Sequence, residues 1–264
     1  MNTREFEMAQ ILTELIENYG AIGLKTSFED EGATFNEVIR LKEICNQSKA
    51  KINLKIGGPE AVRDMNDSTI IGVKGLVAPM VESKFGLEKF INAINIHIDK
   101  SIIPTLNLAI NIETKTSIDN LSEILDSKSA SELYAVTIGR ADLSLSLDIP
   151  RAKINDEEMF QITRLAFKKI KCMGLSTTLG GGISIESYNF IKRLHDEGLI
   201  DNVETRYVMF DSTKLLKNFK KSLLKAQKFE YIWLNNKRTL NSNLADIDID
   251  RINMIKNRIS DSKE

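Results

Sequence analysis

Residues 107–113 read NLAINIE, an alternation of apolar and polar residues that is typical of a β-strand. Leu108, Ile110 and Ile112 share one face of this strand, because successive side chains point to opposite sides. The other face carries Asn111 and ends at Glu113. Longer segments with helical periodicity separate this run from six similar ones, so strands and helices are predicted to alternate along the chain. The other β-rich runs are residues 22–29, 51–56, 76–80, 133–138, 175–179 and 203–210.

Repeated strand–helix units predict an α/β fold, a TIM-type (β/α)8 barrel with additional C-terminal helices. Seven strands are visible, and the eighth is expected either near the N-terminus or in the C-terminal region. An open doubly wound sheet is the alternative, but no GxGxxG follows the first strand. We expect a barrel domain over residues 1–211 and a helical extension over 212–264.

The predicted extension holds one amphipathic helix within residues 213–234 and a final helix within 244–259. Apolar residues in the final helix suggest that it packs on the barrel or on a neighbouring subunit. This pattern favours a homo-oligomer.

The composition is that of an ordinary globular protein, with 264 residues, 42% hydrophobic and 28% charged. A net charge of −1 argues against nucleic acid as a partner. No apolar stretch approaches the roughly 18 residues of a membrane span, so no membrane association is expected. Cys45 and Cys172 lie far apart without a CxxC motif, which predicts buried, reduced thiols in a cytoplasmic protein.

Polar side chains occupy one face of several predicted strands, where a barrel interior is usually filled by Val, Ile and Leu. Burying an unpaired ion costs several kcal/mol, so the charges need partners or solvent. Two interpretations stay open: a structural ion-pair network, or a polar pocket at the C-terminal ends of the strands, where barrel active sites lie. The residues are Lys25, Ser27, Glu29, Asn53, Lys55, Asn107, Asn111, Glu113, Thr137, Glu204 and Arg206.

Two carboxylates follow adjacent strands, Glu113 after the fourth and Asp142 after the fifth. Such a pair suits Mg²⁺ or Mn²⁺, which take one or two protein carboxylates and keep positions for water and substrate. The glycine run 180–182 follows the sixth strand. It fits either a tight turn or an anion site built from backbone N–H groups.

Three segments carry a family resemblance: PMVES at 79–83, NIETKTSIDNLSEIL at 111–125 and IGRADLSLSL at 138–147. In this order and spacing, residues 20–180 resemble the HpcH/HpaI aldolase and citrate lyase β-subunit family. That family consists of metal-dependent barrels of the pyruvate/phosphoenolpyruvate superfamily. The resemblance implies that Glu113 and Asp142 are the metal ligands and that backbone N–H groups near Ala141 receive the substrate carboxylate. It implies a substrate-binding set of Lys55, Gly57, Glu82, Gly139, Arg140 and Ala141.

Two positions depart from the family pattern. Lys55 stands where the family usually has an arginine that reaches the carbonyl oxygen and carboxylate of the substrate, and a lysine lacks that two-pronged donor geometry. Asp30 stands where aldolases of the HpaI type carry a histidine. The expected catalytic set is therefore Lys55, Asp30 and Glu29, with metal-bound water as another base. His97 and His195 fall in predicted helices, and neither is expected to act in catalysis.

The resemblance implies a metal-dependent carbon–carbon lyase or aldolase that acts on a 2-oxo acid or related carboxylate through a pyruvate-like enolate. The expected cofactor is Mg²⁺ or Mn²⁺, and the expected partner is a small-molecule carboxylate. A non-catalytic carboxylate-binding or assembly protein on the same barrel is one alternative. An enzyme acting on a phosphorylated acid is another.

Overall fold

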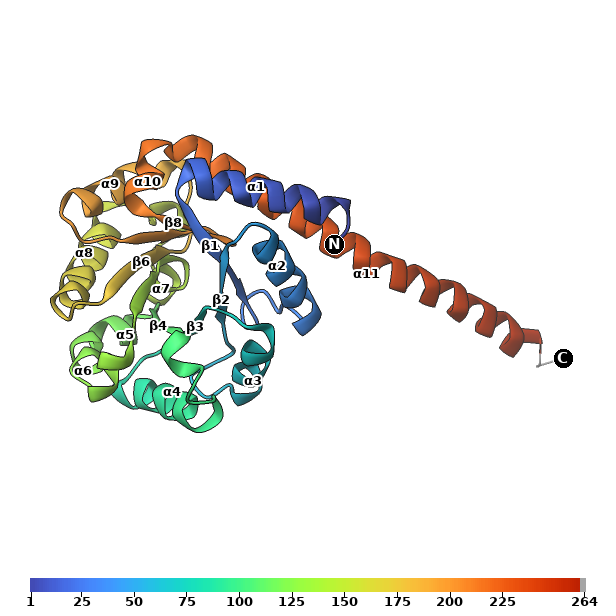
Figure 1. Cartoon of the computed structure of the whole chain (residues 1–264), viewed down its shortest axis with the longest axis horizontal. Helices are drawn as coiled ribbons and strands as arrows, with labels where there is room; N and C mark the ends of the chain where they lie inside the picture. Colours follow the sequence, from blue (N-terminus) through green and yellow to red (C-terminus); the bar gives the residue numbers. More distant parts are fainter. Residues whose placement is uncertain (262–264) are drawn as a thin grey trace.

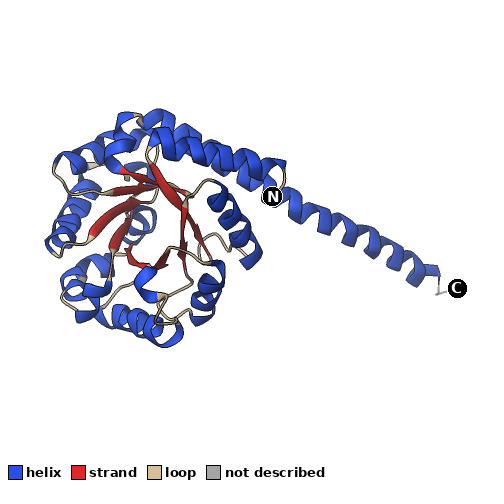
Figure 2. Ribbon diagram, in the orientation of Figure 1, coloured by secondary structure: helices blue, strands red, loops and turns tan. Residues whose placement is uncertain are grey.

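Eight strands close into a barrel with helices around it (Figures 1 and 2). The computed structural model describes residues 1–261, apart from the side chains of residues 240–248, 250 and 256–261. Alternate side chains of the strands, such as Leu108, Ile110 and Ile112, are buried against the surrounding helices. The predicted α/β barrel is therefore confirmed.

The strands pair in chain order around the barrel. They are β1 (Ala21–Ser27), β2 (Lys51–Lys55), β3 (Gly75–Ala78), β4 (Asn107–Ile112), β5 (Ala135–Gly139), β6 (Ser176–Gly180), β7 (Asn202–Glu204) and β8 (Val208–Asp211). The helices on the barrel are α2 (Phe35–Gln47), α3 (Val62–Ile71), α4 (Lys84–His97), α5 (Lys115–Asp119), α6 (Leu121–Leu125), α7 (Arg140–Ser146), α8 (Glu157–Cys172) and α9 (Tyr188–Asp196). Helix α1 (Thr3–Tyr19) precedes β1, and helices α10 (Ser212–Lys217) and α11 (Phe219–Asp261) follow β8.

The eighth strand lies inside the run 203–210, which the sequence pattern predicted as one strand. The backbone N–H of Thr205 donates to Val208 O at 2.9 Å, and Val208 N–H donates back to the Thr205 hydroxyl at 3.1 Å. This turn splits the run into β7 and β8. Strand β8 is antiparallel to both β7 and β1, so the barrel is mixed where repeated strand–helix units predicted only parallel pairs.

Helix α1 and the first part of α11 lie side by side along one edge of the barrel, and α11 then projects beyond it (Figure 1). Lys225 and Lys228 of α11 form ion pairs with Glu14 and Glu7 of α1, at 2.6 and 2.8 Å. Phe229 and Trp233 of α11 are buried.

One further residue of α11, Asn236, donates to the fully buried Glu5 of α1, which also accepts from Arg40 at 2.5 Å. Helix α11 is continuous through the region for which two separate helices were predicted. A short α10 ends at Asn218, just before α11 begins.

Two smaller expectations can be compared with the fold. Cys45 is buried as predicted, and burial raises the pKa of its thiol to about 12. Cys172 is exposed at the end of α8, which corrects the prediction that both thiols are buried. Among the described helices, none combines the length and apolar character needed to cross a bilayer.

Candidate active site

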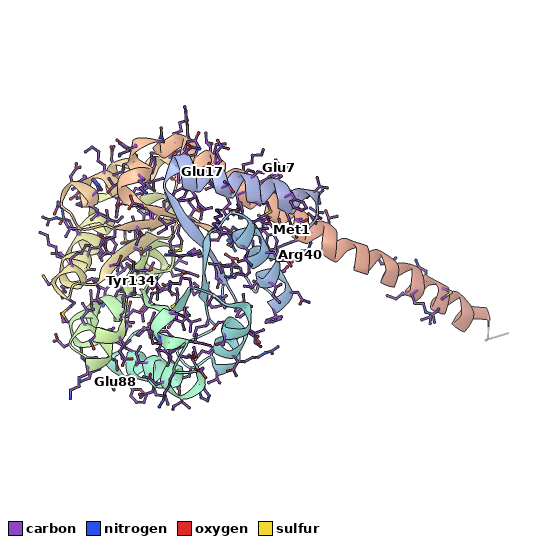
Figure 3. All side chains as sticks on the ribbon, in the orientation of Figure 1. Met1, Glu7, Glu17, Arg40, Glu88 and Tyr134 are labelled. Atoms are coloured by element: carbon purple, nitrogen blue, oxygen red, sulfur yellow. The ribbon has the colours of Figure 1, made fainter. Side chains whose placement is uncertain are left out.

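The barrel interior is hollow, because small side chains such as Ala109 and Ala135 face it. It forms a cavity of about 280 Å³ whose lining also includes Asn53 and Thr137. Tyr134 lies at its rim, beside the start of β5 (Figure 3). The interior is therefore polar and accessible, as the alternation along the strands predicted.

A second cavity, of about 410 Å³, occupies the mouth of the barrel at the C-terminal ends of the parallel strands. Lys25 and Glu204 line both cavities and form an ion pair of 2.7 Å between them. The interior thus contains both an ion pair and a pocket, the two interpretations left open by the sequence. Of the predicted site residues, the mouth cavity brings together Asp30, Lys55, Glu113, Gly139, Ala141 and Asp142.

Glu113 directly follows β4 and is only 2% exposed. Its two carboxylate oxygens accept hydrogen bonds from the backbone N–H of Met80 at 3.0 Å and from Asn111 Nδ2 at 3.1 Å. Burial raises the pKa of Glu113, and the nearby Lys55 ammonium opposes this rise. Gly139 makes room for this side chain, because a Cβ there would lie 2.9 Å from Glu113 Cβ.

Asp142 lies in the first turn of α7, immediately after β5. Burial raises its pKa, and the negative charges of Asp30 and Glu29 add to the rise. Gly181, at φ +76°, packs against the start of this helix, where a Cβ would lie 2.7 Å from Arg140 N. Gly181 therefore lets the loop after β6 pack closely against the β5–α7 junction, and anion binding by the glycine run stays a prediction.

Lys55 ends β2, and its side chain is 15% exposed in the mouth cavity. Its ammonium donates to Glu29 at 2.7 Å. Burial disfavours the Lys55 charge, but Glu113, Glu29 and Asp30 together raise the pKa of Lys55 above its ordinary value. The predicted catalytic residues thus form one coupled group of charges, with Glu29 beside the cavity as the partner of Lys55.

Three predicted substrate-binding residues do not line the mouth cavity. Gly57 is exposed, and its N–H donates to Asp64 at 2.7 Å. Glu82 is exposed and accepts from the Thr114 hydroxyl at 2.7 Å.

The side chain of Arg140, the third of these residues, is fully buried elsewhere. Its guanidinium donates to Ile154 O and Asn155 and lies 4.5 Å from the Phe190 ring. Only the backbone of Arg140 approaches the site.

The structure adds several residues to the site that the sequence pattern did not single out. Glu31 is the third acid of the run 29–31, and Arg151 follows α7. Gln227 and Glu230 come from α11, outside the strand–helix repeat. Only the acidic run itself could have drawn attention to Glu31.

The donor groups at the mouth fit a hard divalent cation. The negative charge of Asp142 adds to the raised pKa of Glu113, as expected for two carboxylates that lie near each other. The buried Oδ1 of Asn111, which bonds Glu113 through Nδ2, has no hydrogen-bond partner within the described part of the chain. Among the described side chains, no group of three His, Cys, Asp or Glu residues converges on one point. Two carboxylates with water suffice for Mg²⁺ or Mn²⁺.

The chain was compared with curated protein sequences and with solved structures. No curated protein sequence matches the chain. Among solved structures, an HpcH/HpaI aldolase from Desulfitobacterium hafniense DCB-2 is 13% identical, with a TM-score of 0.58 over 73% of this chain and 79% of that one. An HpcH/HpaI aldolase/citrate lyase family protein from Burkholderia cenocepacia J2315 is 11% identical, with a TM-score of 0.60 over 84% and 90%. The citrate synthase SbnG is 14% identical, with a TM-score of 0.61 over 85% and 89%.

At these identities the structural likeness establishes the fold, and the family follows from the sequence itself. Residues 48–178 match the model of the HpcH/HpaI aldolase/citrate lyase family. The matched region contains Lys55, Glu113 and Asp142, the three charged residues that meet at the mouth of the barrel. Residues 48–178 of the chain therefore belong to the HpcH/HpaI aldolase/citrate lyase family.

Proposed function

We propose that this protein is a divalent-metal-dependent carbon–carbon lyase, or aldolase, that acts on a 2-oxo acid. The observation that carries the proposal is the convergence of Lys55, Glu113 and Asp142 in one cavity at the C-terminal ends of the barrel strands. Active sites of such barrels lie at this face. A volume of about 410 Å³ falls in the range of small-molecule sites.

Glu113 and Asp142 would hold Mg²⁺ or Mn²⁺, with water and substrate completing the coordination. When bound, the ion supplies Lewis-acid stabilisation of the negative charge that develops on the 2-oxo oxygen. Met80 N–H and Asn111 fix the Glu113 carboxylate before any ligand arrives, so its position costs no reorganisation.

Lys55 neutralises acidic groups of the substrate and of the pocket. Its ammonium stays charged at neutral pH, because the surrounding carboxylates raise its pKa. In this proposal it orients the carbonyl and carboxylate of the 2-oxo acid, while backbone N–H groups near Ala141 receive the carboxylate. Asp30 lines the cavity close enough to Lys55 and Asp142 to affect the pKa of both, and this position supports a role for Asp30 in moving a proton at the enolate carbon.

The test uses the full chain, stripped with a chelator and then given Mg²⁺ or Mn²⁺. Enolate formation is measured as deuterium exchange at C3 of pyruvate in D₂O, and cleavage as pyruvate released from 4-hydroxy-2-oxopentanoate. We expect both reactions to require the ion and to be lost in Glu113→Gln. The matched control is Glu158→Gln, which changes an exposed glutamate of α8. Pyruvate binding without either reaction would favour a non-catalytic carboxylate-binding protein instead.

A further inference from the structure

Glu31 is a buried acid in the mouth cavity for which the proposed function so far gives no role. It lies in the loop after β1, and its side chain is only 5% exposed. The Thr26 hydroxyl donates to its Oε2 at 3.2 Å, and Arg206 Nε lies 3.8 Å from its Oε1. The buried Tyr207 also lies close enough to affect the pKa of this carboxyl group. The carboxylate is therefore held in one position at the wall of the cavity.

The three acids of the run 29–31 have different surroundings. Glu29 is engaged by Lys55 at 2.7 Å. Asp30 is exposed in the cavity, and its charge affects Lys55 and Asp142. These two acids thus lie near the carboxylates that would hold the metal ion.

Glu31 belongs to a different part of the same cavity. The strongest charges acting on it come from Arg206 and Lys25, whereas those acting on Asp142 come from Lys55, Asp30, Glu29 and Arg151. Glu31 follows β1 and Asp142 follows β5, and these two strands lie four places apart in either direction around the eight-stranded barrel, so the two acids lie on opposite walls of the mouth cavity. A 2-oxo acid held by the metal end would extend its leaving portion towards this wall.

Burial raises the pKa of Glu31 above its ordinary value, while Arg206, Lys25, Tyr207 and Thr26 partly oppose the rise. A carboxylate with raised proton affinity is a better base than a surface glutamate. The charged and titratable groups around it are Lys25 from β1, Arg206 and Tyr207 from the β7–β8 turn, and Asp30 beside it.

We propose that Glu31 is the base for the leaving group of the lyase reaction, a role that rests on the proposed function. In cleavage of a 4-hydroxy-2-oxo acid, Glu31 accepts the proton of the C4 hydroxyl. The C4–O bond becomes a carbonyl as the C3–C4 bond breaks, and that electron pair forms the enolate of the 2-oxo fragment. Protonation at C3 then yields the 2-oxo acid, and Glu31 loses its proton to solvent. No oxidant or further reactant is needed.

If Glu31 has this role, its loss should affect cleavage and C3 exchange differently, although both reactions use the same site. Cleavage of 4-hydroxy-2-oxopentanoate requires removal of a hydroxyl proton, whereas deuterium exchange at C3 of pyruvate does not. In Glu31→Gln we therefore expect cleavage to fall by about 10²–10⁴-fold and exchange to stay within about threefold of the wild type. In Asp30→Asn we expect exchange to fall together with cleavage.

The pH profile gives a second measurement. The wild-type cleavage rate should rise with pH as Glu31 loses its proton, and this limb should disappear in Glu31→Gln. Glu31→Asp keeps the acid and should recover part of the rate. Thermal unfolding of each variant verifies the fold.

The possible failures can be told apart. A Glu31→Gln protein that cleaves like the wild type would overturn the role of Glu31 alone. Equal losses of exchange and cleavage in this variant would also overturn it. A wild-type protein that performs neither reaction with Mg²⁺ or Mn²⁺ would overturn the proposed function, and the Glu31 role with it.

Discussion

The substitution Gly181→Ala tests how closely the β6–α9 loop supports the candidate active site. Gly181 has φ +76°, a conformation that costs a residue with a Cβ about 1–2 kcal/mol. A Cβ at this position would also lie 2.7 Å from Arg140 N and closer still to Ala141 N, both of which are backbone atoms at the start of α7. Backbone cannot swing aside as a flexible side chain can.

The expected loss of rate in Gly181→Ala follows from the size of this overlap. Ordinary contacts begin at 3.4 Å, so the loop and the start of α7 must separate by roughly 1 Å. Asp142 lies on the first turn of α7, so it moves with that helix. Misplacement of catalytic groups by about 1 Å can cost about 10²-fold in rate, so we expect a loss of this order in C3 exchange and a weaker Mg²⁺ affinity.

Two matched variants separate strain from displacement. Gly174→Ala, at φ +74°, meets nothing within 4 Å, and Gly182→Ala, at φ +64°, meets the flexible end of Ile154. All three variants should lose about 1–2 kcal/mol of stability from backbone strain in thermal unfolding. Only Gly181→Ala should also lose exchange activity and metal affinity in calorimetry. If Gly181→Ala matches Gly174→Ala in both measurements, the loop does not hold the site.

Further predictions concern single side chains of the site. Glu113→Ala should abolish Mg²⁺ and Mn²⁺ binding in calorimetry with the fold intact, and unchanged affinity would refute the metal assignment. Lys55→Met should weaken pyruvate binding by about tenfold or more with little change in metal affinity, and Lys55→Arg should restore it. The folded pKa of Glu31 is raised, so the wild type should lose stability relative to Glu31→Gln as pH rises above 4.5, whereas below 4.5 the difference in stability should not change with pH. Urea unfolding at several pH values tests whether the stability changes with pH in this direction. His97→Ala and His195→Ala should leave turnover unaltered, and a large loss in either would contradict the absence of a histidine base.

The strand–helix order could be predicted because it rests on local spacing. Apolar residues at alternate positions, as at Leu108, Ile110 and Ile112, must face the helices wherever the strand lies. The positions of Glu113 and Asp142 at neighbouring strand ends follow from the same logic, since the carboxyl ends of parallel strands meet at one face. The polar interior was predictable for the same reason.

The eighth strand was not predictable from this pattern. Thr205–Tyr207 forms a turn without glycine or proline, so the run 203–210 carries no local sign of a break. The reversal is stabilised by pairing of β8 with β1, which lies almost 200 residues away in the chain. Pairing between distant segments leaves no mark on local periodicity.

The direction of individual side chains was decided by tertiary packing as well. Arg140 sits in a family-like motif beside Asp142, yet its side chain turns away to Ile154 and Phe190. Glu31 differs from Glu29 and Asp30 only because Thr26, Arg206 and Tyr207 surround it in the folded chain.

The sequence by itself thus determined the class of barrel and the acids at its strand ends, because both depend on short repeats within one strand–helix unit. The tertiary structure alone decided which acids are buried, which carboxylate Lys55 engages, and that Gln227 and Glu230 of α11 reach the cavity. Those features depend on contacts between segments far apart in the chain. Burial and charge at a site are properties of such contacts, and for this reason they appear only when the chain is folded.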